Sequence, residues 1–161
     1  MGTWNVKPFG NDTALDWVGS LEKAKDGSFL SECIDIIIDQ ANEPDAPECE
    51  EAVAAAAVIA AAASEPVRGI SSEIKSWVKV TGFVPDKFLL KKSLRAIDLI
   101  ATDSELENLW KEGDSFESWI KSLEVVRSTL KDALATDLPT RQPKPKSMPR
   151  LLHKLMALRE G

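Results

Sequence analysis

Histidine and cysteine are scarce in this sequence, and their scarcity removes most nucleophilic enzymes. The 161 residues include one histidine, His153, and two cysteines, Cys33 and Cys49. A Ser-His or Cys-His pair needs a well-placed imidazole, whereas His153 lies in the C-terminal tail beside Lys154. One cysteine falls in an apolar helical pattern and the other among glutamates, so neither a disulfide framework nor a zinc cluster is expected. We therefore expect a non-enzymatic, reduced, cytoplasmic protein.

The sequence also lacks a phosphate-binding loop, a long hydrophobic run and an excess of basic residues. Neither G-x-x-x-x-G-K-[ST] nor G-x-G-x-x-G occurs, which removes the usual signatures of nucleotide binding. The longest apolar run, residues 52–63, is shorter than the ~20 residues that span a bilayer, and no secretory signal pattern is seen. With 26 acidic against 20 basic residues, the net charge of -6 disfavours broad binding to nucleic acid. We expect no cofactor, no nucleic-acid partner and no integral membrane segment.

Hydrophobic spacing predicts an all-α, single-domain bundle of roughly seven helices. Apolar residues recur three and four positions apart in each segment, and no Asn-Gly or Asp-Gly hairpin separates alternating runs. The length and the 43% hydrophobic content suffice for one core. The expected helices are 12–25, 29–40, 48–64, a short one ended by Gly82, 86–101, one closed by Gly113 and one that starts at Ser115.

Several local features are predicted within these helices. The alanine-rich segment 48–64 is apolar all round, which favours a buried central helix that neighbours can approach closely. Asn11 or Asp12 is placed to cap the first helix, and Thr102-x-x-Glu105 predicts a capping box. In 86–101 the stripe directs four side chains inward: Phe88, Leu90, Leu94 and Ile97. Three glutamates are expected to complement the dipole of the central helix: Glu48, Glu50 and Glu51.

The sign of the net charge changes near residue 138. Residues 138–161 carry six Lys or Arg and one acid, a charge of +5, which leaves 14 basic and 25 acidic residues, or -11, in residues 1–137. We expect an acidic helical domain over 1–137, a Pro-rich linker over 138–149 and a basic amphipathic helix over 150–161. That helix could dock on its own body, on another protomer, on a partner or on an anionic membrane surface. Its apolar stripe contains Leu151, Leu152, Leu155 and Met156.

The N-terminus combines aromatic residues with carboxylates. Trp4 and Phe9 flank an extended Lys-Pro dipeptide, ahead of Asp12 and Asp16, which lie four positions apart on one helix face. This arm could offer an aromatic anchor to a partner, but we favour a latch docked on its own bundle, because exposed aromatics promote aggregation. Trp17 falls in phase with the core stripe. Capping and first-turn charge explain Asp12 and Asp16 better than a shared cation does, so they are only weak metal candidates.

The opening M-G-x-W-x-x-x-P-F-x-N-D-x-A-x-D-W resembles the start of a bacterial family catalogued as a domain of unknown function, number 4259. The segment PECEEAVAAAAVIAAA and a later S-E-L-x-x-L-W block agree as well, so that the similarity covers about residues 1 to 132. The family usually has glycine at positions 5 and 7 and aspartate at position 10, where this chain has Asn5, Lys7 and Gly10. The resemblance implies one helical domain over most of the chain and no established activity. The matching residues are Trp4, Phe9, Asn11, Asp12, Asp16, Trp17, Ser104, Glu105, Leu106 and Trp110.

These features favour a non-catalytic domain whose acidic surface binds a basic protein, as in immunity or antitoxin-type proteins, because opposite charges steer association. Two alternatives remain open. One is a metal-dependent domain or enzyme that uses Asp12, Asp16 and Glu105. The other is a structural or regulatory module that acts, or self-associates, through the C-terminal basic helix. The residues put forward for partner binding or for the latch are Trp4, Phe9, Asn11, Asp12, Asp16, Trp17, Ser104, Glu105 and Trp110.

Overall fold

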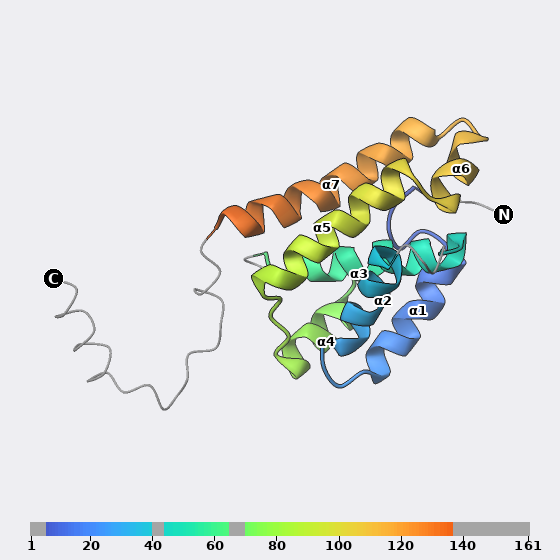
Figure 1. Ribbon diagram of the computed structural model, residues 1–161. Coiled ribbons are helices and arrows are strands. Elements are labelled where there is room, and N and C mark those ends of the chain that lie inside the picture. The colour runs from blue at the N-terminus through green and yellow to red at the C-terminus, as the bar shows by residue number, and fades with distance from the viewer. Residues whose placement is uncertain (1–5, 40–43, 65–69, 137–161) are drawn as a thin grey trace, which may run out of the picture.

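The described part of the computed structural model, residues 6–39, 44–64 and 70–136, contains seven α-helices and no strand (Figure 1). This confirms the all-α prediction. None of these helices combines the length and the apolar character needed to cross a membrane. The predicted linker 138–149 and helix 150–161 lie outside the described residues. The helices are α1 Asp12–Lys23, α2 Ser28–Ile38, α3 Ala46–Ala62, α4 Ser72–Thr81, α5 Lys87–Thr102, α6 Glu105–Lys111 and α7 Phe116–Ala135.

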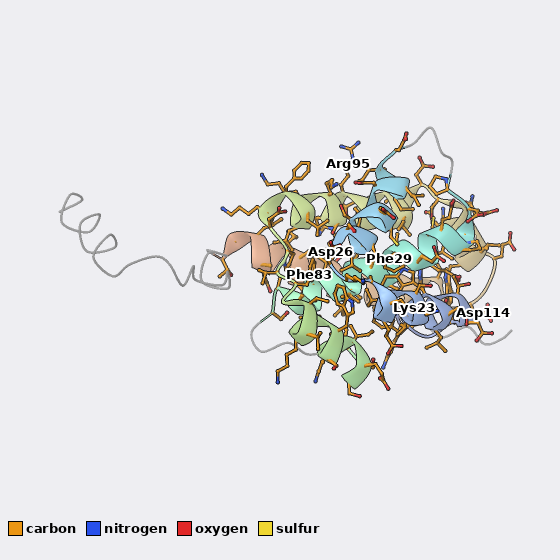
Figure 2. The ribbon with its side chains drawn as sticks, turned by 90° about the horizontal axis from the view of Figure 1, so that it is seen from below. Lys23, Asp26, Phe29, Phe83, Arg95 and Asp114 are labelled. Carbon is orange, nitrogen blue, oxygen red and sulfur yellow. The ribbon has the colours of Figure 1, made fainter. Side chains whose placement is uncertain are left out.

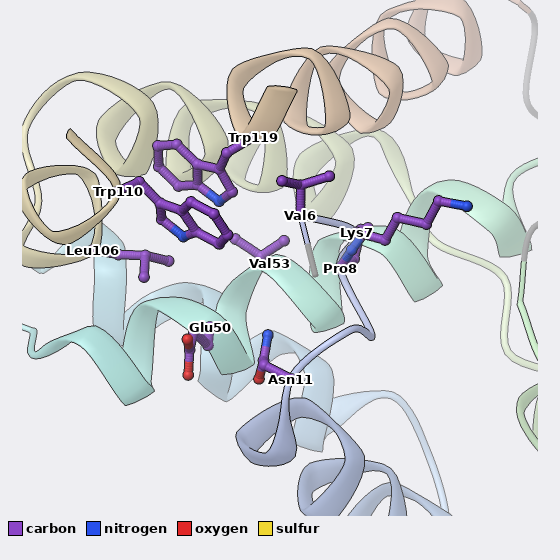
Figure 3. A pocket seen from close by; sticks show the side chains of 9 residues that line it. All are labelled: Val6, Lys7, Pro8, Asn11, Glu50, Val53, Leu106, Trp110 and Trp119. Carbon is purple, nitrogen blue, oxygen red and sulfur yellow. The ribbon is translucent and has the colours of Figure 1, made fainter. Parts of the chain in front are cut away.

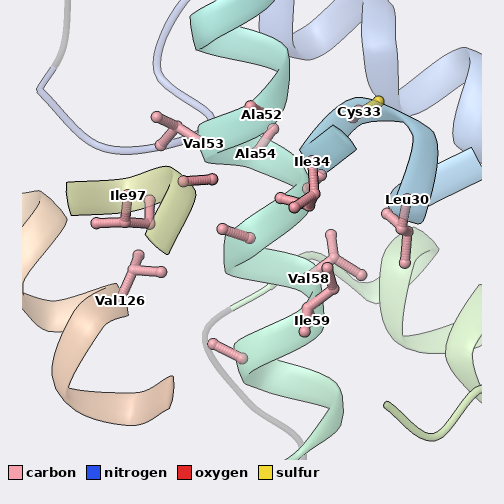
Figure 4. Close-up of a cluster of buried hydrophobic side chains, with 14 of the residues drawn as sticks. Leu30, Cys33, Ile34, Ala52, Val53, Ala54, Val58, Ile59, Ile97 and Val126 are labelled. Carbon is pink, nitrogen blue, oxygen red and sulfur yellow. The ribbon is translucent and has the colours of Figure 1, made fainter. Parts of the chain in front are cut away.

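Helix α3 forms the centre of the molecule because its alanine side chains let other helices come close. It packs against α1, α2, α5, α6 and α7, as the prediction of a buried central helix requires. Ala52, Ala54 and Ala55 are completely buried. Small side chains on the central helix leave room for larger ones from its neighbours. These include Leu30 and Ile34 of α2, Ile97 of α5 and Val126 of α7 (Figure 4).

Helix ends are fixed by residues suited to each terminus. The Asn11 side chain accepts a hydrogen bond from the N–H of Ala14 at 2.8 Å and so caps α1. A complete capping box, made by Asp45 and Glu48, begins α3. Gly82 ends α4 with a φ of 70°, a left-handed conformation that glycine adopts without steric cost. Of the two predicted caps, Asn11 and Asp12, the structure shows Asn11, and the predicted stop at Gly82 is confirmed.

The predicted capping box Thr102-x-x-Glu105 is wrong. Ser104 caps α6, because its hydroxyl accepts a hydrogen bond from the N–H of Glu107 at 2.9 Å. Thr102 instead ends α5, and its hydroxyl donates to the carbonyl of Asp98 at 2.8 Å. The two candidate caps lie two positions apart, and the one nearer the start of α6 does the capping.

Predicted positions are also wrong within α3 and α5. Helix α3 begins at Ala46, so Pro47 lies in its first turn, where the N–H that proline lacks has no helical partner to lose. Phe88 is 67% exposed, because Leu89 and Leu90 take the buried positions at the start of α5. In addition, α1 and α2 both end two residues earlier than predicted.

The turn between α1 and α2 is held by α4 and the residues that follow it. The indole N–H of Trp77 donates to the carbonyl of Ala24 at 2.9 Å. The Phe83 ring lies against Trp77, with ring centroids 5.7 Å apart, and it also faces the turn (Figure 2). A Cβ atom on Gly27 would come within 2.5 Å of this ring. Glycine therefore allows the turn to approach Phe83 closely.

Candidate functional site

Residues 6–10 form an arm that lies against the helical body ahead of α1. The carbonyl of Val6 accepts a hydrogen bond from the hydroxyl of Ser122 on α7 at 2.6 Å. The side chains of Val6 and Phe9 pack against the core. The N–H of Gly10 donates to the carbonyl of Lys7 at 2.9 Å, which closes a turn into α1. The arm is thus fixed to α7 of its own chain, whereas Trp4 lies outside the described residues.

The arm closes one side of a small pocket whose other walls come from α3, α6 and α7 (Figure 3). The cavity measures about 10 Å³, which is room for about one water molecule. Sites for whole small molecules measure about 300 to 1,000 Å³. The pocket can therefore hold a single functional group. Its lining consists of Val6, Lys7, Pro8, Asn11, Glu50, Val53, Leu106, Trp110 and Trp119.

Two tryptophans form the aromatic wall of this pocket. The rings of Trp110 and Trp119 stack with centroids 5.9 Å apart and an angle of 10° between their planes. Trp119 is buried and Trp110 is half-buried. Phe116 supports Trp119 from the same helix, with a centroid distance of 5.9 Å. The wall is therefore closely packed and still partly accessible at Trp110.

Glu50 supplies a buried carboxylate to the pocket. Its side chain is 6% exposed, although the sequence pattern predicts only a favourable charge near the start of the helix. Burial raises the pKa of Glu50, the nearby charge of Glu51 adds to this effect, and a hydrogen bond with Thr13 partly offsets it. Glu50 falls on a face of α3 whose other residues are apolar and buried. This position in the sequence is the signal from which its burial could have been predicted.

The two thiols are free and buried. Burial raises the pKa of Cys33 and of Cys49 to about 11 each. The indole N–H of Trp17 also donates to Cys33 Sγ at 3.3 Å, and its ring stacks on Phe29 with centroids 5.6 Å apart. Reactive cysteines instead have a lowered pKa and partial exposure. Trp17 and Cys33 thus form part of the core, where Trp17 is 3% exposed.

The carboxylates put forward as metal candidates lie in different environments. Asp12 and Asp16 are exposed on α1. The Glu105 carboxylate accepts a hydrogen bond from the N–H of Ala46 at 2.5 Å, and it thereby joins α6 to the start of α3. Within the described ranges, no group of three or more His, Cys, Asp or Glu side chains could hold a metal ion.

Helices α1, α3 and α6 begin at the same end of the molecule (Figure 1), and their first residues or the residues just before or after them include several carboxylates. We call this set the acidic end. The capping box of α3 uses only Asp45 and Glu48. Glu51 lies beyond that first turn, and partial burial, with the charges of Glu48 and Asp45, raises its pKa. More negative charge is therefore present than helix capping requires. The acidic end comprises Asp12, Asp16, Asp45, Glu48, Glu51 and Glu105.

Comparison with known proteins places these features in one family. No curated protein and no solved structure matches the chain. A family described as "Domain of unknown function (DUF4259)" matches residues 2–122. The match extends from the arm into α7 and so includes all residues that line the pocket. Because this match covers most of the chain, the protein belongs to the DUF4259 family, as its opening and its S-E-L-x-x-L-W block predicted.

Proposed function

We propose that this domain is a non-catalytic binding module that captures a basic protein through its acidic end, in the manner of an immunity or antitoxin-type protein. The observation that carries the proposal is the excess of carboxylates over what capping needs. Glu51 is partly buried beside Glu48 and Asp45. Its burial and the two neighbouring negative charges all disfavour the ionised form of Glu51. A cationic partner would relieve this repulsion, and opposite charges would speed the encounter.

The composition of the body supports the same function. Residues 1–137 hold 25 acidic and 14 basic residues, and this charge favours a partner of opposite sign. The pocket beside Glu50 has room for one functional group, which suits a contact with a protruding side chain better than the enclosure of a substrate. The raised pKa of both buried thiols fits structural cysteines of a reduced, cytoplasmic protein.

Co-expression with a basic protein from a gene that neighbours this one tests the proposal. We expect the wild-type chain to co-purify with that protein and to protect the host against its toxicity. The variant Asp12→Lys with Asp16→Lys should lose both effects, because it reverses two exposed charges of the acidic end. The control Glu22→Lys with Glu73→Lys makes the same change in net charge on exposed residues at the end of α1 and the start of α4.

The control pair also replaces one first-turn acid, Glu73, and so matches the loss of Asp12 at the start of α1. It should protect and co-purify as the wild type does. Circular dichroism establishes that both pairs are folded. The proposal is overturned if the wild type neither binds nor neutralises a basic neighbour, or if the two charge-reversed pairs behave alike.

A further inference from the structure

We infer that the pocket between the N-terminal arm and α3 binds a single primary ammonium group, the tip of a lysine side chain on the basic partner. This inference rests on the proposed function and names the group that the partner would insert. The pocket combines a buried carboxylate, a stacked tryptophan pair and a cavity the size of one small polar group. The first two features favour a cation, and the third limits its size.

The carboxylate of Glu50 selects for positive charge. Only 6% of Glu50 is exposed, and burying an ionised carboxylate is costly unless a positive group pairs with it. Thr13 supplies a hydrogen bond, but an ionised carboxylate has about four acceptor positions. An inserted ammonium group would donate to the remaining positions and would favour the ionised form. Neutral or anionic groups gain nothing comparable at this carboxylate.

The tryptophan pair favours a cation for a second reason. An ammonium group within about 6 Å of an indole ring is attracted to the negative face of the ring, most strongly where water is excluded. Figure 3 shows the carboxylate of Glu50 and the side chain of Asn11 on one side of the pocket and the rings of Trp110 and Trp119 on the other. Both kinds of group therefore line the space that an occupant would take.

The size of the cavity distinguishes lysine from arginine. About 10 Å³ holds one water-sized group. A primary ammonium is compact, whereas the guanidinium group of arginine is a planar fork with three nitrogens. The methylene stem of lysine would remain at the mouth of the pocket. We therefore expect the site to prefer a lysine tip over an arginine tip.

The chain's own lysine in the lining does not point into this position. Lys7 belongs to the arm, and Figure 3 shows its side chain extending away from Glu50. The arm thus contributes its backbone and the Val6 and Pro8 side chains to the wall. Its fixed position depends in part on the hydrogen bond between Val6 and Ser122.

Titration of the isolated full-length protein with n-butylammonium chloride tests the inference. The readout is the NMR signal of the indole N–H groups of Trp110 and Trp119, at constant ionic strength. We expect a saturable shift with butylammonium and no saturable shift with n-butanol. Butylguanidinium should bind about tenfold more weakly or worse, because one extra group in a tight pocket changes affinity by about this factor or more.

Two variants complete the test. Glu50→Gln keeps the shape and one acceptor oxygen but removes the charge, and it should abolish the saturable shift. Glu73→Gln removes a charge on α4, outside the lining, and should bind as the wild type does. The inference fails if butylammonium gives no saturable shift in the wild type, if butanol gives the same shift, or if Glu50→Gln binds equally well.

The comparison of butylammonium with butanol uses only the wild-type protein and so does not depend on the folding of a variant. No protein partner is present in this titration. A negative result with a positive co-purification would therefore reject the lysine pocket and keep the acidic-end proposal. The reverse pair of results would reject the proposed function and its lysine-bearing partner, and would keep only the ammonium site.

Discussion

The carboxylate of Glu105, at the start of α6, accepts a hydrogen bond from the backbone N–H of Ala46, the first residue of α3. The first N–H groups of an α-helix have no partner within the helix. A side chain 59 positions further along the chain thus satisfies one of them. Glu105 thereby holds two helix starts together at the acidic end.

Replacement of Glu105 by alanine should destabilise the fold. The N–H of Ala46 would lose a charged acceptor, and we expect the free energy of unfolding to fall by about 1 kcal/mol. Urea unfolding followed by circular dichroism measures the change. Asn108→Ala, at an exposed position of the same helix, is the matched control and should change stability by less than about 0.5 kcal/mol. Equal effects of the two variants would contradict the bridging role.

The raised pKa of Glu50 predicts a pH dependence of stability. Its folded pKa lies above the ordinary value of 4.5, so its contribution to stability is fully present below that value and is lost as pH rises through the folded pKa. Glutamine does not titrate, so the Glu50→Gln variant does not lose stability in this way as pH rises. We expect the variant to be more stable than the wild type at neutral pH, with the difference shrinking at about pH 4.

Urea unfolding of both proteins over this pH range measures that difference. Glu73→Gln, at an exposed position of α4, controls for the change in net charge and should show no such trend. A stability gap that stays constant or widens on acidification would show that the carboxylate of Glu50 is not disfavoured in the folded protein.

The close approach of Gly27 and Phe83 predicts a steric cost at the turn between α1 and α2. A Cβ at position 27 would meet the Phe83 ring at 2.5 Å, and the ring is also held against Trp77. Gly27→Ala should therefore reduce the free energy of unfolding by about 1 to 3 kcal/mol. In the background of Phe83→Leu, the same substitution should cost less, and additive effects in this double-mutant cycle would exclude a direct clash.

The buried hydroxyl of Ser93 on α5 leads us to expect that its removal stabilises the fold. Its side chain is completely buried, and its hydroxyl is the buried side-chain polar atom without a hydrogen-bond partner in the described ranges. Removal of that hydroxyl in Ser93→Ala should raise the free energy of unfolding by about 1 kcal/mol, because a buried polar group without a partner is costly. Thermal and urea unfolding measure the gain. A loss of more than about 1 kcal/mol would instead indicate that the hydroxyl has a partner in solution.

Signals that depend on neighbouring residues in sequence predicted much of the fold. The Asn11 cap, the Gly82 stop and the alanine-rich central helix follow from local chemistry, and the structure confirms them. Errors arose where two nearby residues compete for one role. Ser104 and Thr102 both have a hydroxyl suited to capping, and the choice depends on where α5 ends.

The pocket could not be predicted in the same way, because its parts come from distant segments. Periodicity placed Trp110 and Trp119 on apolar stripes but not against each other. Burial of Glu50 depends on α1 and the arm as well as on its own helix. The contact between Glu105 and Ala46 likewise exists only once α6 packs against α3. Contacts of this kind have no signature within a short sequence window.

The affinity of the purified domain for a basic protein from a neighbouring gene, measured by calorimetry over a range of salt concentrations, tests the central claim most directly. If the acidic end makes the contact, the affinity should fall as salt rises. It should also fall about tenfold or more in the variant Asp12→Lys with Asp16→Lys, and stay unchanged in Glu22→Lys with Glu73→Lys. No binding by the wild type, or binding that neither salt nor reversal of the acidic end weakens, would contradict the claim.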